Sequence, residues 1–445
     1  MRFTLPKGWL KKKLVEIADV QTGIAKGKKN ISDPVTRPYL RVANVQDGRL
    51  DLNEIKIINI SRHEIDRFSL REGDVLFTEG GDFDKLGRGT VWRDEIPGCL
   101  HQNHVFAVRI KNGQILPYYL STYASSFWGR TYFLSCSKQT TNLASINSTQ
   151  LKAMPLPIPP LSEQAKITTI LSTWDRAIEL NEKLIAAKQK RKEALMQQLL
   201  TGSVRLPQFQ RDEKNRAAGI VRVPAAVRRG LYPPSVQPGI PKITYRPDGW
   251  DEITIDKLLH IEKRPIELND DEEYQLVVAK RNRGGIEPRE KLRGYEVKTP
   301  TQFEVKSGDF VISKRQIIHG ACGIVPTSLD GAVVSNEYSV CTVNGSLDMV
   351  FLKYLSHTLY FQQTCFQASV GVALEKMIFR LEQWLKFPFL IPPIDEQREI
   401  VSVLAAMDQE IDLLKNRSTL LSQQKKGLMQ QLLTGKVRVN MENEK

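Results

Sequence analysis

The sequence predicts two α+β domains and two long helices, arranged as a pseudo-two-fold internal repeat. Residues 158–164 read Ile-Pro-Pro-Leu-Ser-Glu-Gln, and residues 391–397, which lie 233 positions later, read Ile-Pro-Pro-Ile-Asp-Glu-Gln. At the same offset, residues 195–202 are identical to residues 428–435. Over the whole repeat, 21 of 50 aligned positions are identical without an insertion or deletion. A duplicated long helix indicates a two-fold scaffold that holds two binding partners or domains at a fixed separation.

Each copy of the repeat predicts a helix of about 40 residues, or roughly 60 Å at ~1.5 Å per residue. A Pro-Pro pair stops any helix before it, because proline lacks an amide hydrogen and disfavours helical geometry in its predecessor. Ser162 in the first copy and Asp395 in the second can cap the first turn. The glutamate that follows each of them interacts favourably with the helix dipole. Gly202 and Gly435 can adopt the left-handed backbone conformation that commonly ends a helix at its C-terminus.

Apolar residues recur along both helices in alternate steps of three and four, which is the pattern of a coiled-coil seam. Polar residues interrupt the seam at a few positions, where they weaken packing but fix register and orientation. We interpret the two helices as packing on each other within one chain; the alternative is two separate amphipathic helices, each lying on its own domain. The predicted seam residues are Ile167, Leu171, Trp174, Ile178, Ile185, Leu195, Leu199, Ile400, Leu404, Met407, Ile411, Leu414, Leu421, Leu428 and Leu432, interrupted by Asn181, Lys188, Lys192, Ser418 and Lys425.

The segments ahead of the two helices repeat a second framework. The pattern Pro-x-Gly-Trp ends at Trp9 and again at Trp250, and Gly-Asp precedes an apolar run at residues 73–77 and 308–312. Gly-Asp predicts a turn and the apolar run a buried strand. Both segments mix short β-rich runs with one or two helices, so each is predicted to be an α+β domain. A shared framework with different loops is expected of two recognition modules that read different targets.

Between the first helix and the second domain lies a basic, proline-rich segment. It holds nine Lys and Arg against two Asp and Glu, and five prolines fall between residues 224 and 241. This composition predicts an extended linker rather than a domain. Its charge could contact a phosphate backbone, and a solvated tether is an equal alternative. The predicted division is 1–158 for the first domain, 159–202 for the first long helix, 203–246 for the linker, 247–391 for the second domain, 392–435 for the second long helix and 436–445 for a C-terminal tail.

Composition points to a cytoplasmic protein that meets a polyanion. The chain has 445 residues, 41% of them hydrophobic and 26% charged, a formal net charge of +14 and a pI near 9.4. Such a basic balance is typical of proteins that bind nucleic acid. The five cysteines are scattered and never spaced as C-x-x-C, which argues against a disulfide framework and against a structural zinc site. Neither a signal peptide nor an apolar run long enough to cross a membrane is evident.

Motifs for catalysis are missing from the sequence. The Pro-Pro pairs lie in Ile-Pro-Pro-Leu and Ile-Pro-Pro-Ile rather than in a methyltransferase motif, and no phosphate-binding loop has the required spacing. Residues 99–104, Cys-Leu-His-Gln-Asn-His, look metal-like but lack a fourth ligand, so a polar cluster at a strand edge is the favoured interpretation. Two Glu-x-Lys tripeptides, at residues 296–298 and 304–306, are expected by chance. We predict that the chain has no catalytic residues, no metal and no cofactor of its own.

The doubled pattern Ile-Pro-Pro-x-x-Glu-Gln, a long helix and Leu-Leu-Thr-Gly-x-Val-Arg, behind domains that open with Pro-x-Gly-Trp, resembles the specificity subunit of prokaryotic Type I restriction–modification systems. The resemblance covers nearly the whole chain. It implies two target-recognition domains, each reading one half of a bipartite site in double-stranded DNA, and an antiparallel coiled coil that sets the gap between the halves. It also implies two methyltransferase subunits, which supply S-adenosylmethionine chemistry on adenine, and a translocase–nuclease subunit for cleavage. The basic linker departs from this picture.

Specific DNA binding needs side chains at base edges, and affinity needs cations along phosphates. Loop segments with this chemistry occur in both domains, and residues 138–142 combine a cation, amides and hydroxyls suited to base readout. The DNA-binding candidates are Lys26, Lys28, Lys29, Lys85, Arg88, Lys138, Gln139, Thr140 and Asn142 in the first domain, and Arg281, Asn282, Arg283, Lys314, Arg315, Gln316 and Lys376 in the second.

Three other functions are compatible with the same residues. The chain could be the recognition part of a split methyltransferase or nuclease whose catalytic part lies elsewhere. It could be a scaffold whose helices bind protein and whose domains do not touch DNA. It could also be the specificity subunit of a methylation-only defence system without a nuclease.

Overall fold

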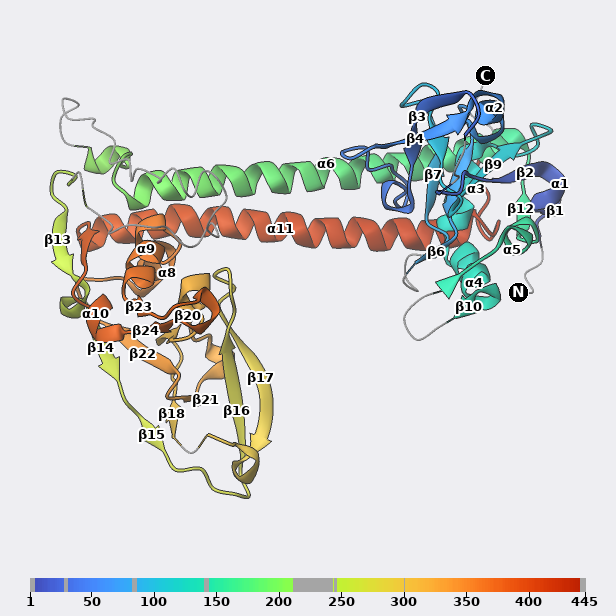
Figure 1. The fold of residues 1–445 in the computed structure, drawn as a ribbon. Coiled ribbons are helices and arrows are strands. Elements are labelled where there is room, and N and C mark those ends of the chain that lie inside the picture. Colours follow the sequence, from blue (N-terminus) through green and yellow to red (C-terminus); the bar gives the residue numbers. More distant parts are fainter. Residues whose placement is uncertain are drawn as a thin grey trace. The chain divides into compact units, whose positions relative to one another are not determined.

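The chain forms two compact units, and each long helix contributes to both of them. The computed structural model describes residues 5–27, 31–81, 86–139, 144–210, 243, 246–299 and 301–440. The first unit is Met1–Lys183 with Leu414–Lys445, and the second is Leu184–Leu413. The long helices are α6 (Leu161–Leu200) and α11 (Ile394–Leu432) (Figure 1). Each unit therefore holds one α+β domain, the N-terminal half of one long helix and the C-terminal half of the other.

Both long helices begin directly after their Pro-Pro pairs. In α6 the backbone amide of Gln164 donates to the carbonyl oxygen of Pro160 at 3.0 Å, and α11 repeats this bond at the same distance. Ser162 and Asp395 consequently lie inside the first turn, two positions after the N-cap, so the prediction that they cap the helices was wrong. The C-terminal prediction is confirmed, because Gly202 has φ +67° and Gly435 has φ +71°.

Polar residues of the seam join α6 to α11 in the first unit. The side-chain amide of Asn181 donates to the backbone oxygen of Leu414 at 2.8 Å, and these two positions are counterparts in the repeat. Closer to the domain, the ammonium of Lys425 pairs with the carboxylate of Asp175. As residue numbers rise along α6 they fall along α11, so the helices are antiparallel.

The second unit repeats this arrangement. Lys192 pairs with Asp408, which is the counterpart of the Lys425 pair in the first unit, and Lys188 lies 2.6 Å from Glu410. Every predicted seam residue, apolar or polar, is buried or half-buried, whereas the positions between them are mostly exposed. The polar interruptions therefore form inter-helix bonds, which specify one register as well as one orientation.

The domain of the first unit is built on a four-stranded antiparallel sheet. Its strand order is β2-β9-β5-β7, and β5 is buried along its whole length, as its apolar run predicts. Helices α3 and α4 pack on this sheet through a core that includes Phe77, Phe106 and Tyr119. The strands of this sheet are β2 (Ala18–Thr22), β5 (Val75–Thr78), β7 (Gly89–Val91) and β9 (Val105–Ile110); the helices are α1 (Leu14–Ile17), α2 (Ile65–Phe68), α3 (Pro117–Ser125), α4 (Phe127–Cys136) and α5 (Ser148–Lys152).

Smaller sheets complete the first domain. A two-stranded sheet joins its beginning to its end, just before α6 starts. A three-stranded sheet carries a long hairpin, and another small sheet joins three short strands. These are β1 (Leu10–Lys13) with β12 (Pro155–Ile158); β4 (Lys56–Ser61), β3 (Pro34–Leu40) and β8 (Leu100–His101); and β10 (Lys138–Gln139), β11 (Ala144–Ser145) and β6 (Gly80–Gly81).

The domain of the second unit repeats the four-stranded sheet and the closing pair. Its strand order is β14-β22-β19-β20, with the same antiparallel pairing as in the first domain, and β19 is again fully buried. These elements are β13 (Asp251–Thr254) with β25 (Pro388–Ile391); β14 (Leu259–Glu262), β19 (Phe310–Ser313), β20 (Cys322–Ile324) and β22 (Tyr338–Val343); and helices α8 (Met349–Leu355), α9 (Leu359–Gln367) and α10 (Leu381–Trp384).

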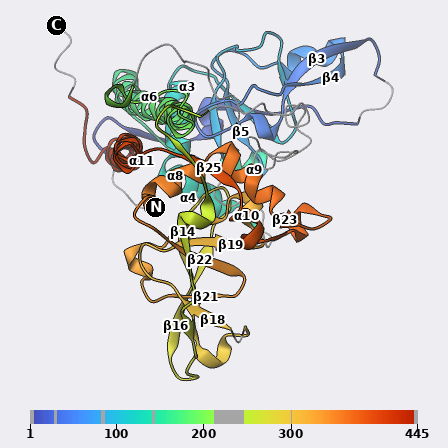
Figure 2. The same ribbon diagram turned by 90° about the vertical axis from the view of Figure 1, so that its left-hand side faces the viewer.

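A five-stranded sheet distinguishes the second domain from the first. It lies beyond the four-stranded sheet when the domain is followed away from α8 and α9 (Figures 1 and 2). Its edge strand β17 is exposed along almost its whole length, and the turn from β16 to β17 comes back toward α8. The strands are β15 (Pro265–Ile266), β16 (Glu273–Ala279), β17 (Ile286–Arg293), β18 (Gln302–Glu304) and β21 (Val333–Ser335), and a separate pair is β23 (Ser369–Val370) with β24 (Ile378–Phe379).

Candidate nucleic-acid interface

In the first unit, the repeated motifs meet at one buried carboxylate. Glu163, which is 2% exposed, accepts a hydrogen bond from the indole nitrogen of Trp9 at 3.0 Å. The guanidinium of Arg438 donates to both oxygens of the same carboxylate, at 2.6 and 2.8 Å. A Cβ atom on Gly435 would lie only 2.2 Å from Pro6, so the chain leaving α11 packs directly on the Pro-x-Gly-Trp segment. The domain is thus bonded to the start of one long helix and the end of the other.

The second unit contains the same junction. Glu396, 1% exposed, accepts from Trp250 at 3.1 Å and from Arg205 at 2.9 and 2.6 Å. A Cβ atom on Gly202 would lie 2.2 Å from Pro247. Arg205 falls at the start of the segment assigned to the linker, so that segment begins with a residue bonded to the domain. The repeated motifs therefore hold domains to helix ends.

The glutamine of each Glu-Gln pair fastens a second segment of the domain. The side-chain oxygen of Gln164 accepts the backbone amide of Leu116 at 2.8 Å, and the side-chain oxygen of Gln397 accepts that of Asp348 at the same distance. Leu116 and Asp348 immediately precede α3 and α8, respectively. Each long helix therefore fixes the position of the first domain helix as well as that of the opening tryptophan.

We expect Glu396→Ala to lower the free energy of unfolding by about 3 kcal/mol, because it removes the carboxylate that accepts hydrogen bonds from the half-buried guanidinium of Arg205 and from the buried indole N–H of Trp250. Chemical unfolding of the purified chain measures this loss. Glu399→Ala, on the exposed face of the same helix, is the matched control and should change stability by less than about 0.5 kcal/mol. Equal stability of the two variants would contradict the proposed junction.

Of three described candidates of the first domain, Arg88 lies directly before strand β7, Lys138 lies at the start of β10, and Lys26 lies in the loop after β2. Lys26 is exposed, and its ammonium lies 5.7 Å from the ring centre of Tyr39. Arg88 is half-buried and donates to the side-chain oxygen of Gln46 at 2.7 Å. Lys138 is exposed and opens β10, which joins β6 through β11. The small sheet therefore brings two separately predicted segments together. The candidates Lys28, Lys29, Lys85, Thr140 and Asn142 lie outside the described residues, and of Gln139 only the backbone is described.

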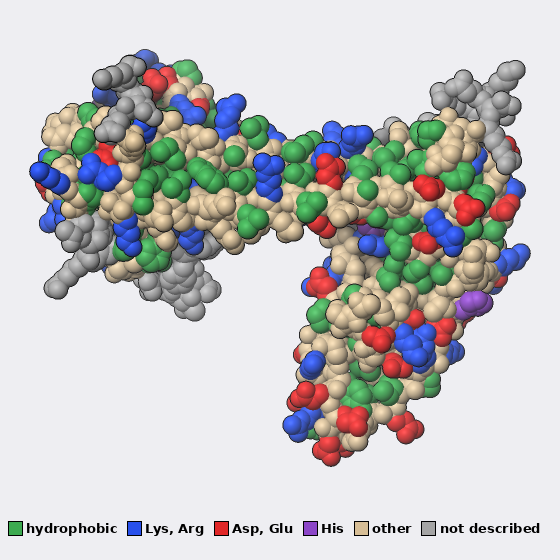
Figure 3. Space-filling view, turned by 180° about the vertical axis from the view of Figure 1, so that it is seen from behind, with side chains coloured by type: hydrophobic (Ala, Val, Ile, Leu, Met, Phe, Trp, Pro, Cys, Tyr) green, Lys and Arg blue, Asp and Glu red, His purple; other side chains and the backbone are tan. Residues whose placement is uncertain are grey.

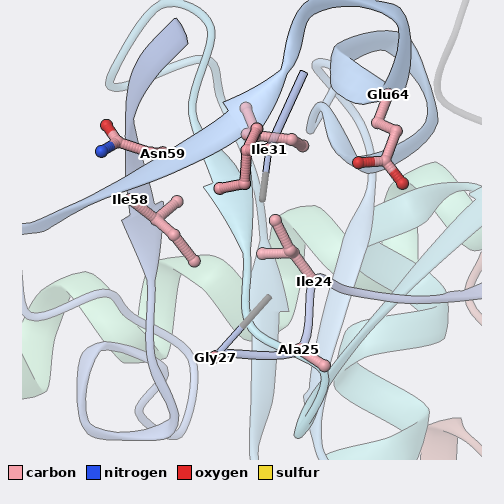
Figure 4. A pocket seen from close by; sticks show the side chains of 8 residues that line it. Ile24, Ala25, Gly27, Ile31, Ile58, Asn59 and Glu64 are labelled. Atoms are coloured by element: carbon pink, nitrogen blue, oxygen red, sulfur yellow. The ribbon is translucent and has the colours of Figure 1, made fainter. Parts of the chain in front are cut away.

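A hollow of about 240 Å³ lies beside Lys26. Figure 4 shows the side chains of Ile24, Ile31 and Ile58 gathered around it, with Asn59 and Glu64 at its margin. Four isoleucines supply apolar lining, while Asn59, Glu64 and backbone atoms supply hydrogen-bonding groups, so the hollow offers both kinds of surface.

The candidates of the second domain gather around the turn between β16 and β17. Arg281 donates through Nε to the side-chain oxygen of Gln316 at 2.7 Å and through Nη2 to the carboxylate of Glu375 at 2.8 Å. Glu375 directly precedes Lys376, which is exposed. Three segments that are distant in sequence thus form one polar cluster, and two of its predicted members bond to each other.

The backbone of this turn is bonded to the neighbouring loop. The amide of Asn282 donates to the backbone oxygen of His319 at 2.7 Å, and the amide of Arg283 to that of Gly320 at 3.1 Å. The Arg283 side chain points inward and donates to the backbone oxygen of Ser356 at 3.4 Å, and burial lowers its pKa. Arg283 therefore supports the turn from inside, which sequence alone did not predict.

The two remaining second-domain candidates are already paired. Lys314 donates to the backbone oxygen of Asn336 at 2.6 Å. Arg315 donates to both carboxylate oxygens of Glu337, at 2.6 and 3.2 Å, and hydrogen bonding to this carboxylate raises the pKa of Arg315. Both lie on the loop that follows β19, the counterpart of β5.

Charge is divided unevenly between the domains. Residues 1–158 contain 23 Lys and Arg against 15 Asp and Glu, whereas residues 247–391 contain 17 against 20. On the face drawn in Figure 3, acidic and basic side chains alternate over the β-rich part of the second domain. General attraction to a polyanion therefore rests mainly on the first domain and the linker, and the second domain depends more on particular contacts.

Sequence reasoning missed a polar cluster where α8 meets the long helices. The hydroxyl of Tyr354 donates to Asp408 at 2.8 Å, and Lys192 bonds the same carboxylate. Burial opposes ionisation of Asp408, but these two hydrogen bonds lower its pKa overall. Burial lowers the pKa of the neighbouring His357 to about 4, so this histidine is neutral at pH 7. The one available signal was the identity of Asp408 with its repeat counterpart Asp175.

The metal-like run at residues 99–104 is a strand and the turn after it. His101 is fully buried, its Nδ1 lies 2.7 Å from the backbone oxygen of Val105, and burial lowers its pKa. His104 is paired instead with Glu79. Within the described part of the chain, no group of three or more His, Cys, Asp or Glu side chains is placed to hold a metal ion.

A family model described as "Type I restriction modification DNA specificity domain" matches residues 6–188 and 247–423. The chain belongs to this family. Its two matched segments are the two domains with most of the long helix that follows each one, in agreement with the internal repeat. The predicted α+β architecture and the predicted role as a noncatalytic specificity subunit of a Type I restriction–modification system are confirmed by this membership. DNA and other subunits of such a system are its partners.

One similar protein matches nearly the whole chain, and another matches part of it. The putative type I restriction enzyme MjaX specificity subunit of Methanocaldococcus jannaschii is 25% identical over 437 residues, covering 98% of this chain and 95% of that protein. The EcoKI specificity subunit of Escherichia coli K12 is 30% identical over 135 residues, which are 30% of this chain and 29% of that protein.

Solved structures share the fold. The HsdS subunit from Thermoanaerobacter tengcongensis matches with a TM-score of 0.50 and 17% identity, covering 98% of this chain and 99% of that one. A chain from a structure describing complex assembly and conformational transition of the type I R-M system matches with a TM-score of 0.59 and 18% identity, covering 98% and 100%. In the described parts of this chain, no helix has the length and apolar character needed to span a membrane.

Proposed function

We propose that residues 1–158 and 247–391 are target-recognition domains that each read one half of a bipartite site in double-stranded DNA. The observation that carries this proposal is the contrast between constant and variable parts. Both domains share a four-stranded sheet and a Trp–Glu–Arg junction, yet they differ in their remaining sheets and in the loops that hold the candidate residues. One framework with two different reading surfaces suits two different half-sites.

The helix pair, residues 159–202 and 392–435, sets the distance between the half-sites. Its ends are bonded to the domains through buried Glu163 and Glu396, and its seam carries register-fixing bonds in both units. Because each domain is bonded to the helix ends, the length of the helices determines where each domain lies. Residues 203–246 connect the first helix to the second domain, and residues 436–445 form the tail.

Two methyltransferase subunits dock on the outer faces of this helix pair, one per repeat. Leu180 on α6 and Leu413 on α11 are repeat counterparts, and they are 54% and 63% exposed. Large apolar side chains at equivalent exposed positions are what two copies of one partner would contact. The partner holds S-adenosylmethionine and methylates adenine, a translocase–nuclease subunit joins for cleavage, and the assembly acts on DNA in the cytoplasm.

The stoichiometry of the complex tests this assembly. With saturating partner, we expect one chain to bind two methyltransferase subunits in sedimentation or native mass measurements. Leu180→Asp should reduce the ratio to one to one, and Leu180→Asp with Leu413→Asp should abolish binding, because each change removes one apolar contact. Ile57→Asp, an equally exposed position on β4, is the control and should keep the ratio. A wild-type ratio of one to one would contradict the two-fold assembly.

A further inference from the structure

The turn from β16 to β17 is a tight hairpin turn. Asn282 has φ 56° and Arg283 has φ 61°, so two successive residues adopt the left-handed conformation, and the amide of Gly284 donates to the backbone oxygen of Arg281 at 3.2 Å. Hairpin turns favour this conformation and asparagine tolerates it, but an arginine in it needs support from its surroundings. Here the surroundings are the two backbone hydrogen bonds to His319 and Gly320 and the inward-pointing side chain of Arg283. The turn is therefore rigidly shaped, and its shape determines where the Arg281 side chain lies.

The Arg281 side chain is held from two sides. Gln316 accepts from its Nε at 2.7 Å, and Glu375 accepts from its Nη2 at 2.8 Å. The other oxygen of Glu375 lies 3.4 Å from Nε2 of His319. Despite these partners the Arg281 side chain remains 50% exposed. Among the described residues, nothing accepts a hydrogen bond from its Nη1.

These contacts occupy one edge of the guanidinium and leave its outer end open. The two Nη1 hydrogens and the second Nη2 hydrogen remain available, and the end of a guanidinium forms two parallel hydrogen bonds with O6 and N7 of guanine. We propose that Arg281 reads a guanine in the half-site of the second domain, with Gln316 and Glu375 as positioning residues. This proposal rests on the proposed function and names one base that the second domain requires.

The charge around Arg281 favours a base over a phosphate. A cation that serves a phosphate gains from an uncompensated charge, but Arg281 is paired with Glu375 in a domain where acidic residues outnumber basic ones. A fixed guanidinium plane is more useful for base readout, since its hydrogen-bond geometry discriminates among base pairs. Arg289 of β17 is also exposed and paired with a glutamate, Glu290, but it lies outside the turn and is not among the DNA-binding candidates, so it is a natural comparison.

The experiment uses the complex of the full chain with its methyltransferase subunit and a pool of random-sequence duplex DNA, and the bound fraction is sequenced. We expect a bipartite motif from the wild type. Arg281→Lys should reduce the preference for guanine about tenfold at one position of one half-site, because lysine cannot form the two parallel bonds. Glu375→Ala should weaken the preference at that same position. Arg289→Lys, at an exposed arginine of β17 that is not among the DNA-binding candidates, is the control and should leave that position unchanged.

The outcomes separate this proposal from the proposed function. An unchanged motif for Arg281→Lys, or a change spread over both half-sites, would overturn the role of Arg281 while leaving bipartite recognition intact. The absence of any motif for the wild type would overturn the proposed function itself. If Arg281→Lys unfolds at a lower temperature than the wild type, the Glu375→Ala variant provides the test instead, because it keeps the arginine. An unaltered guanine preference in the Glu375→Ala variant overturns the positioning role and with it the proposal.

Discussion

Removing one heptad from each long helix, residues 182–188 and 415–421 together, should shorten the unspecified gap of the recognised DNA site by about three base pairs. Seven residues account for roughly 10 Å of helix, and B-DNA advances ~3.4 Å per base pair. A heptad deletion keeps the seam in phase, because the apolar pattern repeats every seven residues. Sequencing of methylated positions in a host genome that carries the variant measures the gap.

The structure decides which heptad to remove. The deleted segments lie between the Asp175–Lys425 and Lys192–Asp408 bridges, so both bridges and both Trp–Glu–Arg junctions are kept. Deletion from one helix alone is the control, since it breaks the register of at least one bridge and should destabilise the protein. An active double-deletion variant that kept its original gap would mean that something other than these helices sets the distance.

Exchanging the interior of one domain should replace one half of the methylated motif and leave the other half intact. The exchange of residues 259–385 for the corresponding segment of another family member keeps Trp250, the β13–β25 pair and the helix ends. The Trp–Glu–Arg junction of this chain then holds the DNA-contacting loops of the exchanged segment where the original loops were. The same measurement of methylated positions identifies both half-sites.

The reciprocal exchange in the first domain, residues 18–152, is the matched control and should change the opposite half-site. It keeps Trp9 and the β1–β12 pair. A single exchange that altered both half-sites together would show that the domains do not read independently. The effect is expected to be complete rather than partial, because each framework sheet and junction is self-contained within its unit.

Local features were predictable because local physics determines them. The Pro-Pro pairs stop the helices, and Gly202 and Gly435 take the left-handed conformation that glycine tolerates best. The capping prediction was wrong for Ser162 and Asp395 because the helices begin earlier, directly after the second proline of each pair, whose carbonyl accepts the first helical hydrogen bond. Helix boundaries inferred from single residues commonly differ from the observed ones by a residue or two.

Nonlocal partners were not predictable in the same way. Glu163 was interpreted only as favourable against the helix dipole, yet it bonds Trp9, 154 residues away, and Arg438, 275 residues away. Of the second-domain candidates, Arg281 and Gln316 were chosen separately for their chemistry, and the bond between them spans 35 residues. Glu375, which holds Arg281, gave no signal at all, since one glutamate beside a lysine is unremarkable in a charged chain.

Four features could be determined from the sequence alone: the duplication, the two long helices with an apolar seam along which they can pair, the repeated domain framework and the family. Those features follow from periodicity and from residues with strong conformational preferences, which act over a few positions. Only the tertiary structure decided that each domain is bonded to the start of one helix and the end of the other, and that Arg281 is held by Gln316 and Glu375. Such contacts depend on how distant segments pack around a shared core, and no short-range preference encodes that choice.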